Sequence, residues 1–510
     1  MTGSTFDVAI VGCGPVGAMA ANLLGRQGLS VVVLEKELEH YPLPRAVHLD
    51  HEMMRLFQSA GVVDRVAGDM IATDGHLHVG ADHGVIRYMG TVGKPRPFGW
   101  ANDYFFYQPE LEAHLRQAFA ENGRIDLRLG AEFTGLRQDA AGVTLSYTNG
   151  AVDNEVRVRW VIACDGARSP VRKALGVKLD DLDFEEPWLV VDAEVEGPVA
   201  FPPIDGVPEG ADLQRLSVMM CDPERPATVV PGRGNHRRWE FMLLPGEDDA
   251  VMAQPETVGR LVGAWMKDVP HTIVRAATYR FHGLVAEQWQ VGRVFLAGDA
   301  AHQTPPFFGQ GMCHGLRDVA NLAWKMAAIA NDDADEAILA TYQPERDPHV
   351  RGVIGAAVGA GRYICELDRQ KAAERDAAIR AQSANRSGET AADLIPAIDC
   401  GFVSTGTAGA GERFIQPTLD DGRKLDDHAG HGWRLFVRDA SIGGDARGVA
   451  RMVATELPDG GAVLAWLDAR EVDAVLVRPD HYVFGTAKGS ALPLLDLRER
   501  HLHQPAEIAA

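Results

Sequence analysis

Positively charged residues and cysteines are both scarce in this chain. Lys and Arg number 50 against 71 Asp and Glu, which leaves a net charge of −21 at pH 7. Nucleic-acid-binding proteins need a basic surface, so this balance argues against a nucleic-acid partner. The six cysteines are widely spaced, with no C-x-x-C motif and no zinc-like pairing with histidine. We therefore predict no metal site, and reduced thiols in a cytoplasmic protein.

A secretion signal and a membrane-spanning segment are also missing from the sequence. Residues 1–7 contain no basic residue ahead of an apolar stretch, unlike a secretory signal. Residues 8–25 carry no charge, but Gly12, Gly14, Pro15 and Gly17 within them would break a membrane helix. We therefore expect no membrane partner.

The length of the chain and its pattern of polar and apolar residues predict several domains. Its 510 residues are 46% apolar and 24% charged, a globular composition long enough for about two to four domains. Short buried strands at both ends of the first 365 residues are typical of a parallel sheet, whereas the region between them alternates polar and apolar residues, as antiparallel strands do. We expect an α/β domain over 1–185 and 286–365, an antiparallel-sheet domain over 186–285 with a contribution from 76–105, a helical linker over 366–400, and a further unit over 401–510.

A glycine-rich motif follows a predicted strand at residues 6–11 and precedes a predicted helix. Gly12, Gly14 and Gly17 have the G-x-G-x-x-G spacing, in which the glycines allow a tight turn and let a pyrophosphate approach the helix N-terminus. Glu35 ends the second predicted strand, where a carboxylate can accept hydrogen bonds from a ribose diol. Together these features predict a dinucleotide site.

Two further motifs place an acidic residue directly after a buried strand. A predicted strand at residues 160–164 ends in Asp165-Gly166, and another at residues 294–297 leads into Gly298-Asp299. A glycine-rich turn then enters a long predicted helix at residues 312–329, whose N-terminus could stabilise negative charge on a cofactor ring.

In this order, the three motifs resemble those of the single-component flavoprotein aromatic hydroxylases, over roughly residues 5–365. Pro44-Arg45-Ala46, Tyr107-Gln108-Pro109 and residues 317–325 are most similar to the 3-(3-hydroxyphenyl)propionate hydroxylase and phenol hydroxylase subgroups. The resemblance implies an α/β fold with a Rossmann-like FAD-binding domain, an antiparallel-sheet substrate domain and a C-terminal thioredoxin-like domain. Without C-x-x-C, that last domain cannot perform dithiol chemistry, so we expect a structural role or a role in forming a homodimer.

The resemblance also implies FAD as cofactor, with NADH or NADPH and O2 as co-substrates. The glycines of the first motif should face the pyrophosphate, Glu35 the adenosine ribose and Asp299 the ribityl chain, while Asp165 should serve both FAD and the reduced nicotinamide. The expected FAD contacts are Gly12, Gly14, Pro15, Val16, Gly17, Glu35, Lys36, Arg45, Gln108, Asp165, Gly166, Gly298, Asp299, Pro306, Gly309, Gln310, Gly311 and Met312.

The implied reaction is hydroxylation of a phenol by a C4a-hydroperoxyflavin, and it calls for a base. Deprotonating the phenol pushes electron density onto the ring carbons that receive oxygen, and the site must exclude water. His48 with Asp50 is one candidate pair, and His302 is another. No single arginine in residues 186–285 stands out as a clamp for a substrate carboxylate.

Three other interpretations compete with this one. A flavin-dependent halogenase is excluded, because no two of the nine tryptophans are two residues apart, as a W-x-W motif requires. The expected substrate is 3-(3-hydroxyphenyl)propionate-like or another simple phenol of aromatic catabolism. A hydroxylase of larger, polyketide-type polycyclic aromatics stays open, and a non-catalytic flavin-binding redox sensor is the remaining alternative.

Overall fold

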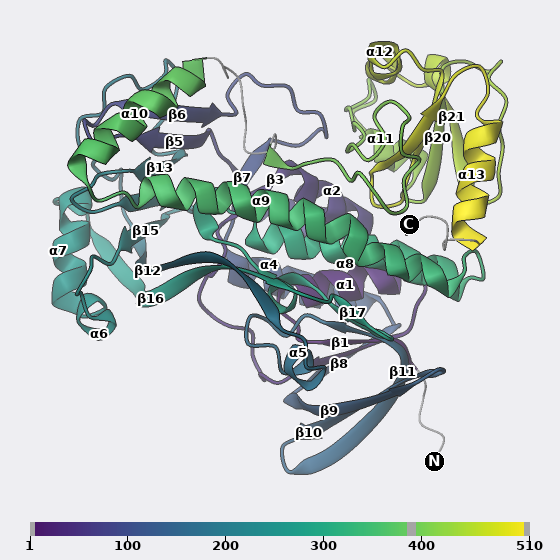
Figure 1. Ribbon diagram of the computed structural model, residues 1–510, viewed down its shortest axis with the longest axis horizontal. Coiled ribbons are helices and arrows are strands. Elements are labelled where there is room, and N and C mark those ends of the chain that lie inside the picture. Colours follow the sequence, from purple (N-terminus) through teal and green to yellow (C-terminus); the bar gives the residue numbers. More distant parts are fainter. Residues whose placement is uncertain (1–5, 385–393, 504–510) are drawn as a thin grey trace.

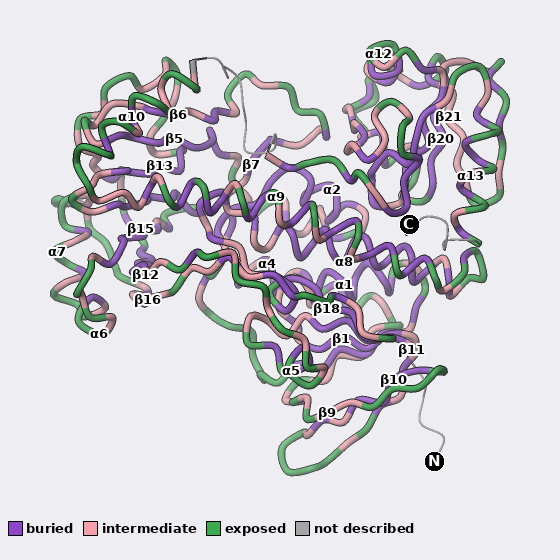
Figure 2. The backbone as a smooth tube through the Cα atoms, viewed as in Figure 1, coloured by how far each residue is buried: buried purple, intermediate pink, exposed green. Residues whose placement is uncertain are grey.

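The computed structural model describes residues 6–384 and 394–503 (Figure 1). Two eight-stranded sheets lie on either side of two long helices that cross the middle of the molecule, α8 (Gly311–Ala330) and α9 (Tyr342–Ile364). A four-stranded sheet from the C-terminal part of the chain lies at one end of these helices. Burial is greatest along the central helices and the sheets beside them, whereas the outer hairpin of the first sheet is largely exposed (Figure 2).

The first sheet is built around parallel strands whose apolar residues are buried. Its order is β17-β18-β11-β1-β2-β8, and β9 and β10 extend it through β11. Apolar side chains on both faces suit strands that are covered on both sides. The elements are β1 (Phe6–Val11), α1 (Pro15–Arg26), β2 (Val31–Glu35), β8 (Ile125–Leu129), β9 (Ala131–Asp139), β10 (Gly142–Asn149), β11 (Val152–Ala163), α5 (Pro170–Ala174), β17 (Gln290–Val291) and β18 (Val294–Leu296).

One expectation about this sheet is wrong. A separate strand was expected at residues 160–164, but residues 160–163 are the end of β11, which is continuous over twelve residues. Its first part pairs antiparallel with β10 and its second part parallel with β1 and β18. The pattern of polar and apolar residues therefore changes along β11 because the neighbouring strands change, and not because the strand is interrupted.

The second sheet has the order β19-β16-β12-β15-β14-β13-β5-β6. Its pairs are antiparallel, as expected, except that β5 runs parallel to β13, so the sheet is mixed. Its last two strands, β5 and β6, come from residues 75–79 and 85–90. The elements are β5 (Gly75–Val79), β6 (Val85–Gly90), β12 (Leu179–Val195), β13 (Leu216–Met220), β14 (Ala227–Pro231), β15 (His236–Met242), α6 (Asp249–Met252), α7 (Pro255–Met266), β16 (His271–Ala286) and β19 (His302–Gln303).

The two faces of this second sheet differ because its strands alternate side chains. One face forms an apolar core with α7, to which Val258, Val262 and Met266 contribute. The other face carries polar side chains and looks toward the first sheet. A small sheet and several helices fill the space between: β3 (His48–Asp50), α2 (His51–Ala60), α3 (Val63–Val66), β4 (Ile71–Ala72), β7 (Asp103–Phe105) and α4 (Gln108–Gln117).

The chain then passes through α10 (Arg369–Ala384), which packs on β6, into the C-terminal unit. The helix α10 lies within residues 366–400, the expected linker, of which residues 385–393 lie outside the described part. The C-terminal sheet has the order β21-β20-β22-β23, in which β20 and β21 are parallel and the other pairs antiparallel. Its elements are α11 (Leu425–Ala429), β20 (Trp433–Val437), β21 (Val449–Val453), α12 (Gly461–Ala469), β22 (Ala474–Val477), β23 (Val483–Ala487) and α13 (Leu492–His503).

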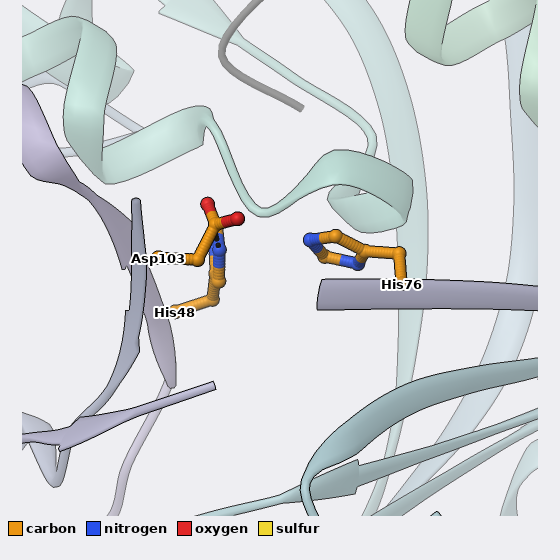
Figure 3. Close-up of side chains that lie close together, drawn as sticks. All are labelled: His48, His76 and Asp103. Atoms are coloured by element: carbon orange, nitrogen blue, oxygen red, sulfur yellow. Dashed lines mark hydrogen bonds and ion pairs between the residues drawn. The ribbon is translucent and has the colours of Figure 1, made fainter. Parts of the chain in front are cut away.

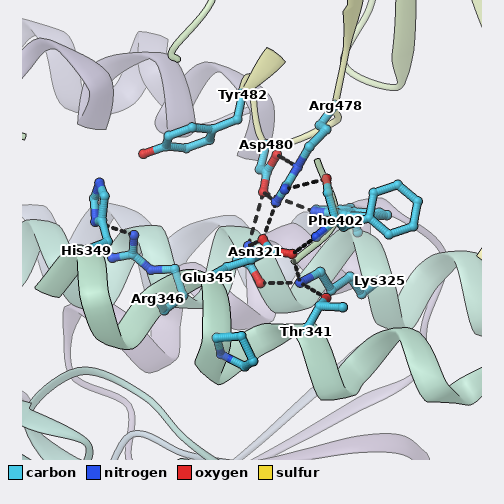
Figure 4. Close-up of polar contacts among 12 residues, drawn as sticks. Asn321, Lys325, Thr341, Glu345, Arg346, His349, Phe402, Arg478, Asp480 and Tyr482 are labelled. Carbon is cyan, nitrogen blue, oxygen red and sulfur yellow. Dashed lines mark hydrogen bonds and ion pairs between the residues drawn. The ribbon is translucent and has the colours of Figure 1, made fainter. Parts of the chain in front are cut away.

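A buried ionic network joins this C-terminal unit to the central helices (Figure 4). Arg478 lies 2.7 Å from Glu345 of α9 and 2.6 Å from Asp480, and Lys325 of α8 contacts Glu345 at 3.0 Å. These four side chains have exposures of 4% or less, so the network anchors the unit through interior contacts. Across residues 6–384 and 394–503, no helix is both long and apolar enough to cross a bilayer. All six cysteines are free.

Candidate active site

A cavity of about 280 Å³ lies between the two large sheets. One end is lined by the glycine-rich turn after β1 and by the residues after β11 and β18. The other end is lined by β5, β13, β14 and β15 of the second sheet, and the turn before α8 lies between. The predicted site residues on its wall are Gly14, Pro15, Val16, Arg45, His48, Gln108, Gly166, Asp299, Pro306, Gly309, Gly311 and Met312.

The glycine-rich turn has the geometry of a pyrophosphate cradle. Gly12 has φ +93°, and a Cβ there would lie 2.5 Å from the carbonyl oxygen of Cys164. A Cβ on Gly17 would lie 2.0 Å from the carbonyl oxygen of Gly12, so helix and strand pack too closely for a side chain. Gly14 has open space on its Cα, and it begins α1 with no capping side chain. The helix N-terminus is therefore available to an anion.

Glu35 lies beside this turn at the end of β2. Its Oε2 accepts a hydrogen bond of 2.6 Å from the Cys13 backbone N–H, and its Oε1 accepts one of 2.9 Å from Glu37. This places the carboxylate next to the cradle, where the sequence predicts the ribose. Lys36 is 65% exposed and pairs with Glu37, away from the described lining of the cavity.

The two predicted Asp motifs stand at the carboxyl ends of β11 and β18. Oδ2 of Asp165 accepts a hydrogen bond from Val171 at 3.0 Å, while its Oδ1 is buried without a protein partner. A buried acceptor without a partner is expected to meet a ligand or water. Asp299 is exposed on the cavity wall within a short 3-10 helix, Gly298–Ala300. These observations fit a polar cofactor that spans both strand ends.

The turn before α8 separates the two ends of the cavity. Gly309 has φ +62°, and a Cβ there would lie 2.4 Å from Nδ1 of His48. Gly311 and Met312 begin α8 on the cavity wall. Gln310 is buried instead, with its Oε1 accepting a hydrogen bond from Arg317 at 3.1 Å, and it is not part of the described lining.

Arg45 and Gln108 are linked through the backbone. The Gln108 side-chain oxygen accepts hydrogen bonds from the backbone N–H groups of Arg45 at 3.0 Å and Ala46 at 2.7 Å. Arg238 of β15 donates to the carbonyl oxygens of Pro44 and Arg45. Gln108 and Arg238 therefore hold this loop at the edge of the cavity from two sides.

His48 is paired with Asp103, a residue the sequence did not single out (Figure 3). Its Nε2 lies 3.0 Å from Oδ1 of Asp103. Burial lowers the pKa of His48, but the hydrogen bond and charge of Asp103 outweigh burial, so the pKa is raised from 6.5. Burial likewise opposes ionisation of Asp103, but the hydrogen bond from His48 and its charge lower the pKa of that carboxyl below 3.8.

The other two residues that were candidates for the base, Asp50 and His302, lie elsewhere. Asp50 caps α2 by accepting from the Glu52 backbone N–H, and it is buried in an ion pair of 2.5 Å with Arg317. His302 is buried against Asp318 at 2.7 Å. Neither belongs to the described lining of the cavity, so the structure pairs His48 with Asp103 and not with Asp50.

Sequence reasoning missed most of the second-sheet end of the cavity. It is lined by His76, Ser217, Met219, Thr228, Val230, Arg238 and Glu240. Both ring nitrogens of His76 are buried without a protein partner, and burial together with the charge of His48 lowers its pKa to about 4. The polar–apolar alternation of β13 and β15 was the one available signal, but it did not indicate which face meets the cavity.

Comparison with known proteins shows which family this chain is similar to. The family described as FAD binding domain matches residues 5–357. A 3-(3-hydroxy-phenyl)propionate/3-hydroxycinnamic acid hydroxylase of Burkholderia vietnamiensis is 36% identical, over 94% of this chain and 93% of the relative. A probable NADH-specific resorcinol 4-hydroxylase of Rhodococcus jostii is 35% identical, over 95% of this chain and 92% of the relative.

Solved structures share the fold at lower identity. The flavin-dependent monooxygenase PieE, solved with FAD and substrate, has a TM-score of 0.78 at 23% identity and covers 98% of this chain and 99% of its own. Aklavinone-11 hydroxylase, solved with FAD and aklavinone, has a TM-score of 0.77 at 23% identity and covers 98% of each chain.

Proposed function

This chain belongs to the flavoprotein aromatic hydroxylases, and from that premise we propose that it hydroxylates a simple, single-ring phenol in the catabolism of aromatic compounds. It is an FAD-dependent monooxygenase that consumes reduced nicotinamide and O2. The observation that carries the substrate proposal is that His48, paired with Asp103, lies on the wall of a cavity that also runs along the glycine-rich turn.

The residues at the cofactor end fit FAD. Gly14 and the N-terminus of α1 would face the pyrophosphate, Glu35 the adenosine ribose, and Asp299 with the turn at 306–312 the ribityl chain and the ring. The unpartnered Oδ1 of Asp165 supports a polar ligand beside β11. When bound, the flavin accepts hydride from the nicotinamide and activates oxygen.

The chain's own part in the reaction is to bind, orient and deprotonate the phenol. His48 would take the phenolic proton on a ring nitrogen, and Asp103 would stabilise the resulting imidazolium, as a buried carboxylate does for a histidine base. The flanking Phe105, Phe307 and Val47 would exclude water from the ring.

Single-ring phenols are favoured over polycyclic substrates. The relatives at 35–36% identity are named for 3-(3-hydroxyphenyl)propionate, 3-hydroxycinnamate and resorcinol. The solved enzyme that carries aklavinone is 23% identical, so its likeness supports the fold alone. A redox sensor without catalysis does not account for the His48–Asp103 pair beside the cofactor end.

We propose the same domain division as the sequence predicted, with residues 401–510 as a thioredoxin-like domain. The order β21-β20-β22-β23, with one parallel and two antiparallel pairs and α12 between β21 and β22, supports that assignment. Its role would be structural or in a homodimer, which light scattering of the purified protein would test. The six free cysteines agree with a reducing, cytoplasmic location.

The experiment measures NADH and NADPH oxidation by the FAD-loaded protein in air, with and without a panel of phenols. The panel contains 3-(3-hydroxyphenyl)propionate, 3-hydroxybenzoate, phenol, resorcinol and a polycyclic phenol, and chromatography identifies the products. Strong stimulation by a single-ring phenol, with a hydroxylated product, is the expected result. Stimulation by the polycycle alone, or oxidation that no phenol stimulates, would contradict the proposal.

A further inference from the structure

The second-sheet end of the cavity is formed by two parallel rows of side chains on one face. In one row Ser217 is opposite His76, and Val230 is opposite Arg238. In the other row Met219 is opposite Thr228, and Thr228 is opposite Glu240. Residues directly opposite in neighbouring strands point to the same side of a sheet. The rows therefore present five polar side chains, together with Met219 and Val230, to a ligand at this end of the cavity.

Cations are nearly absent from this surface. Among the lining residues in the described part of the chain, the arginines are Arg45 and Arg238, and there is no lysine. Arg238 is committed to Asp192 at 2.8 Å and to the carbonyl oxygens of Pro44 and Arg45 at 2.7 and 2.6 Å. Asp192 is fully buried and also pairs with His236 at 2.9 Å and Arg275 at 3.5 Å, so the Arg238 donors are committed within a closed cluster.

Arg45 and His48 do not supply the missing charge. The Arg45 side chain is exposed and its guanidinium lies 5.3 Å from the centre of the Tyr41 ring, at the loop that Gln108 holds. His48 faces Asp103 at 3.0 Å, so any positive charge on its ring is already paired. At the second sheet a ligand carboxylate would thus meet Arg238, whose donors are already committed, and an unpaired buried charge is costly.

His76 and Glu240 instead suit neutral, hydrogen-bonding ligands. Both nitrogens of His76 lack a protein partner although the residue is only 3% exposed, and one ring face lies 5.1 Å from the ring of His48. Because its pKa is about 4, His76 is uncharged at pH 7 and can both donate and accept. The Glu240 carboxyl group lies on the cavity wall, and burial raises its pKa, so a ligand carboxylate there would meet a second acidic group.

We infer that this end of the cavity selects a phenol whose second substituent is uncharged and polar, such as a hydroxyl or an amide, and discriminates against one that bears a carboxylate, with His76 and Glu240 as the selecting groups. The inference rests on the proposed hydroxylase function and narrows its substrate class. Of the chemistries named for the relatives, it favours a dihydroxybenzene over a phenylpropionate.

A pair of ligands with one shape and different charge tests this selection. 3-(3-Hydroxyphenyl)propionate and its primary amide are titrated into the FAD-loaded protein at pH 7, and binding is followed by the change in flavin absorbance and by calorimetry. The amide is expected to bind more tightly by roughly tenfold or more, because burying an unpaired carboxylate costs more than burying an amide that finds partners. Equal or tighter binding of the acid would overturn the inference.

Variants then identify the selecting groups. Glu240→Gln removes the acidic group at constant shape and is expected to reduce the amide-to-acid preference severalfold, while His76→Phe should weaken binding of resorcinol. Glu194→Gln is the matched control, because it makes the same change at an exposed carboxylate of β12, in the same sheet but outside the described lining of the cavity. An unchanged preference in Glu240→Gln would overturn the role of Glu240, and unchanged resorcinol binding in His76→Phe that of His76.

The outcome also separates this inference from the proposed function. Tight binding of the amide without stimulated nicotinamide oxidation by any phenol would contradict the hydroxylase proposal and leave the selectivity standing. Binding of neither ligand would overturn the selectivity itself.

Discussion

His48 and Asp103 face each other from two antiparallel strands, with Nε2 and Oδ1 3.0 Å apart in a buried site. Asp103 is opposite Asp50 in the register of β3 and β7, so its side chain reaches His48 diagonally. The carbonyl oxygen of Gly309 lies 3.5 Å from the other ring nitrogen. The imidazole is thereby oriented from both sides, and His48 lines the cavity.

The pH profile should report this pair. Since the neutral imidazole is the base and its pKa is raised above 6.5, kcat/KM should fall as the pH drops through a value above 6.5. Asp103→Asn removes the charge that raises the pKa, so the acidic limb should move to lower pH. The control is Asp69→Asn, which removes the carboxylate that pairs with His114, a histidine outside the described lining of the cavity. An acidic limb at the same pH in Asp103→Asn would contradict the assignment.

Replacing the base itself should impair hydroxylation and spare the cofactor. His48→Gln is expected to lower the rate of product formation by about 10² to 10⁴, the usual contribution of a general base. FAD content should stay that of the wild type, since His48 lies beyond the turn at Gly309. Steady-state product formation and flavin absorbance check both. The loss should be smaller with more acidic phenols, because these need less help to ionise, and an equal loss for all phenols would contradict the role.

The two glycines at either end of α1's first turn should respond differently to alanine. In Gly17→Ala the new Cβ would lie 2.0 Å from the Gly12 carbonyl, so the variant should be destabilised by about 1–3 kcal/mol or more. In Gly14→Ala the Cβ meets no protein atom within 4 Å, so the FAD-free protein should keep its stability. Thermal unfolding of the FAD-free forms measures this difference.

The same Gly14→Ala variant should bind FAD weakly, because its methyl group would stand where the pyrophosphate approaches the backbone. Fluorescence titration with FAD gives the dissociation constant. Wild-type affinity in this variant would show that the cradle does not hold the pyrophosphate as proposed.

The anchoring of the C-terminal unit depends on Arg478. Arg478→Met should cost about 3–5 kcal/mol, because it leaves the buried carboxylates of Glu345 and Asp480 with less positive charge nearby. Denaturant unfolding measures the loss. Arg369→Gln is the control: Arg369 and its partner Glu224 are 76% and 70% exposed, so its change should stay within about 0.5 kcal/mol. Equal effects would contradict an anchoring role for the network.

The local sequence by itself determined the cofactor half of the protein. The turn at Gly12–Gly17, the carboxylate of Glu35 and the Asp residues after two buried strands are signals that span a few residues each. They depend on backbone conformation and on strand-to-helix order, which short stretches of sequence encode. For the same reason the boundaries of α8 differ by only one residue at each end from the expected 312–329.

Only the tertiary structure decided the substrate half. Asp50 is two residues from His48, yet it turns to cap α2 and pair with Arg317, while Asp103 comes from a distant strand to the imidazole. His76, Ser217 and Glu240 lie far apart in the chain and share one face because of strand register, including the parallel pairing of β5 with β13 that alternation alone does not predict. Long-range pairing, and not local pattern, brings these groups together, because a strand's period of two leaves its partner and its exposed face undetermined.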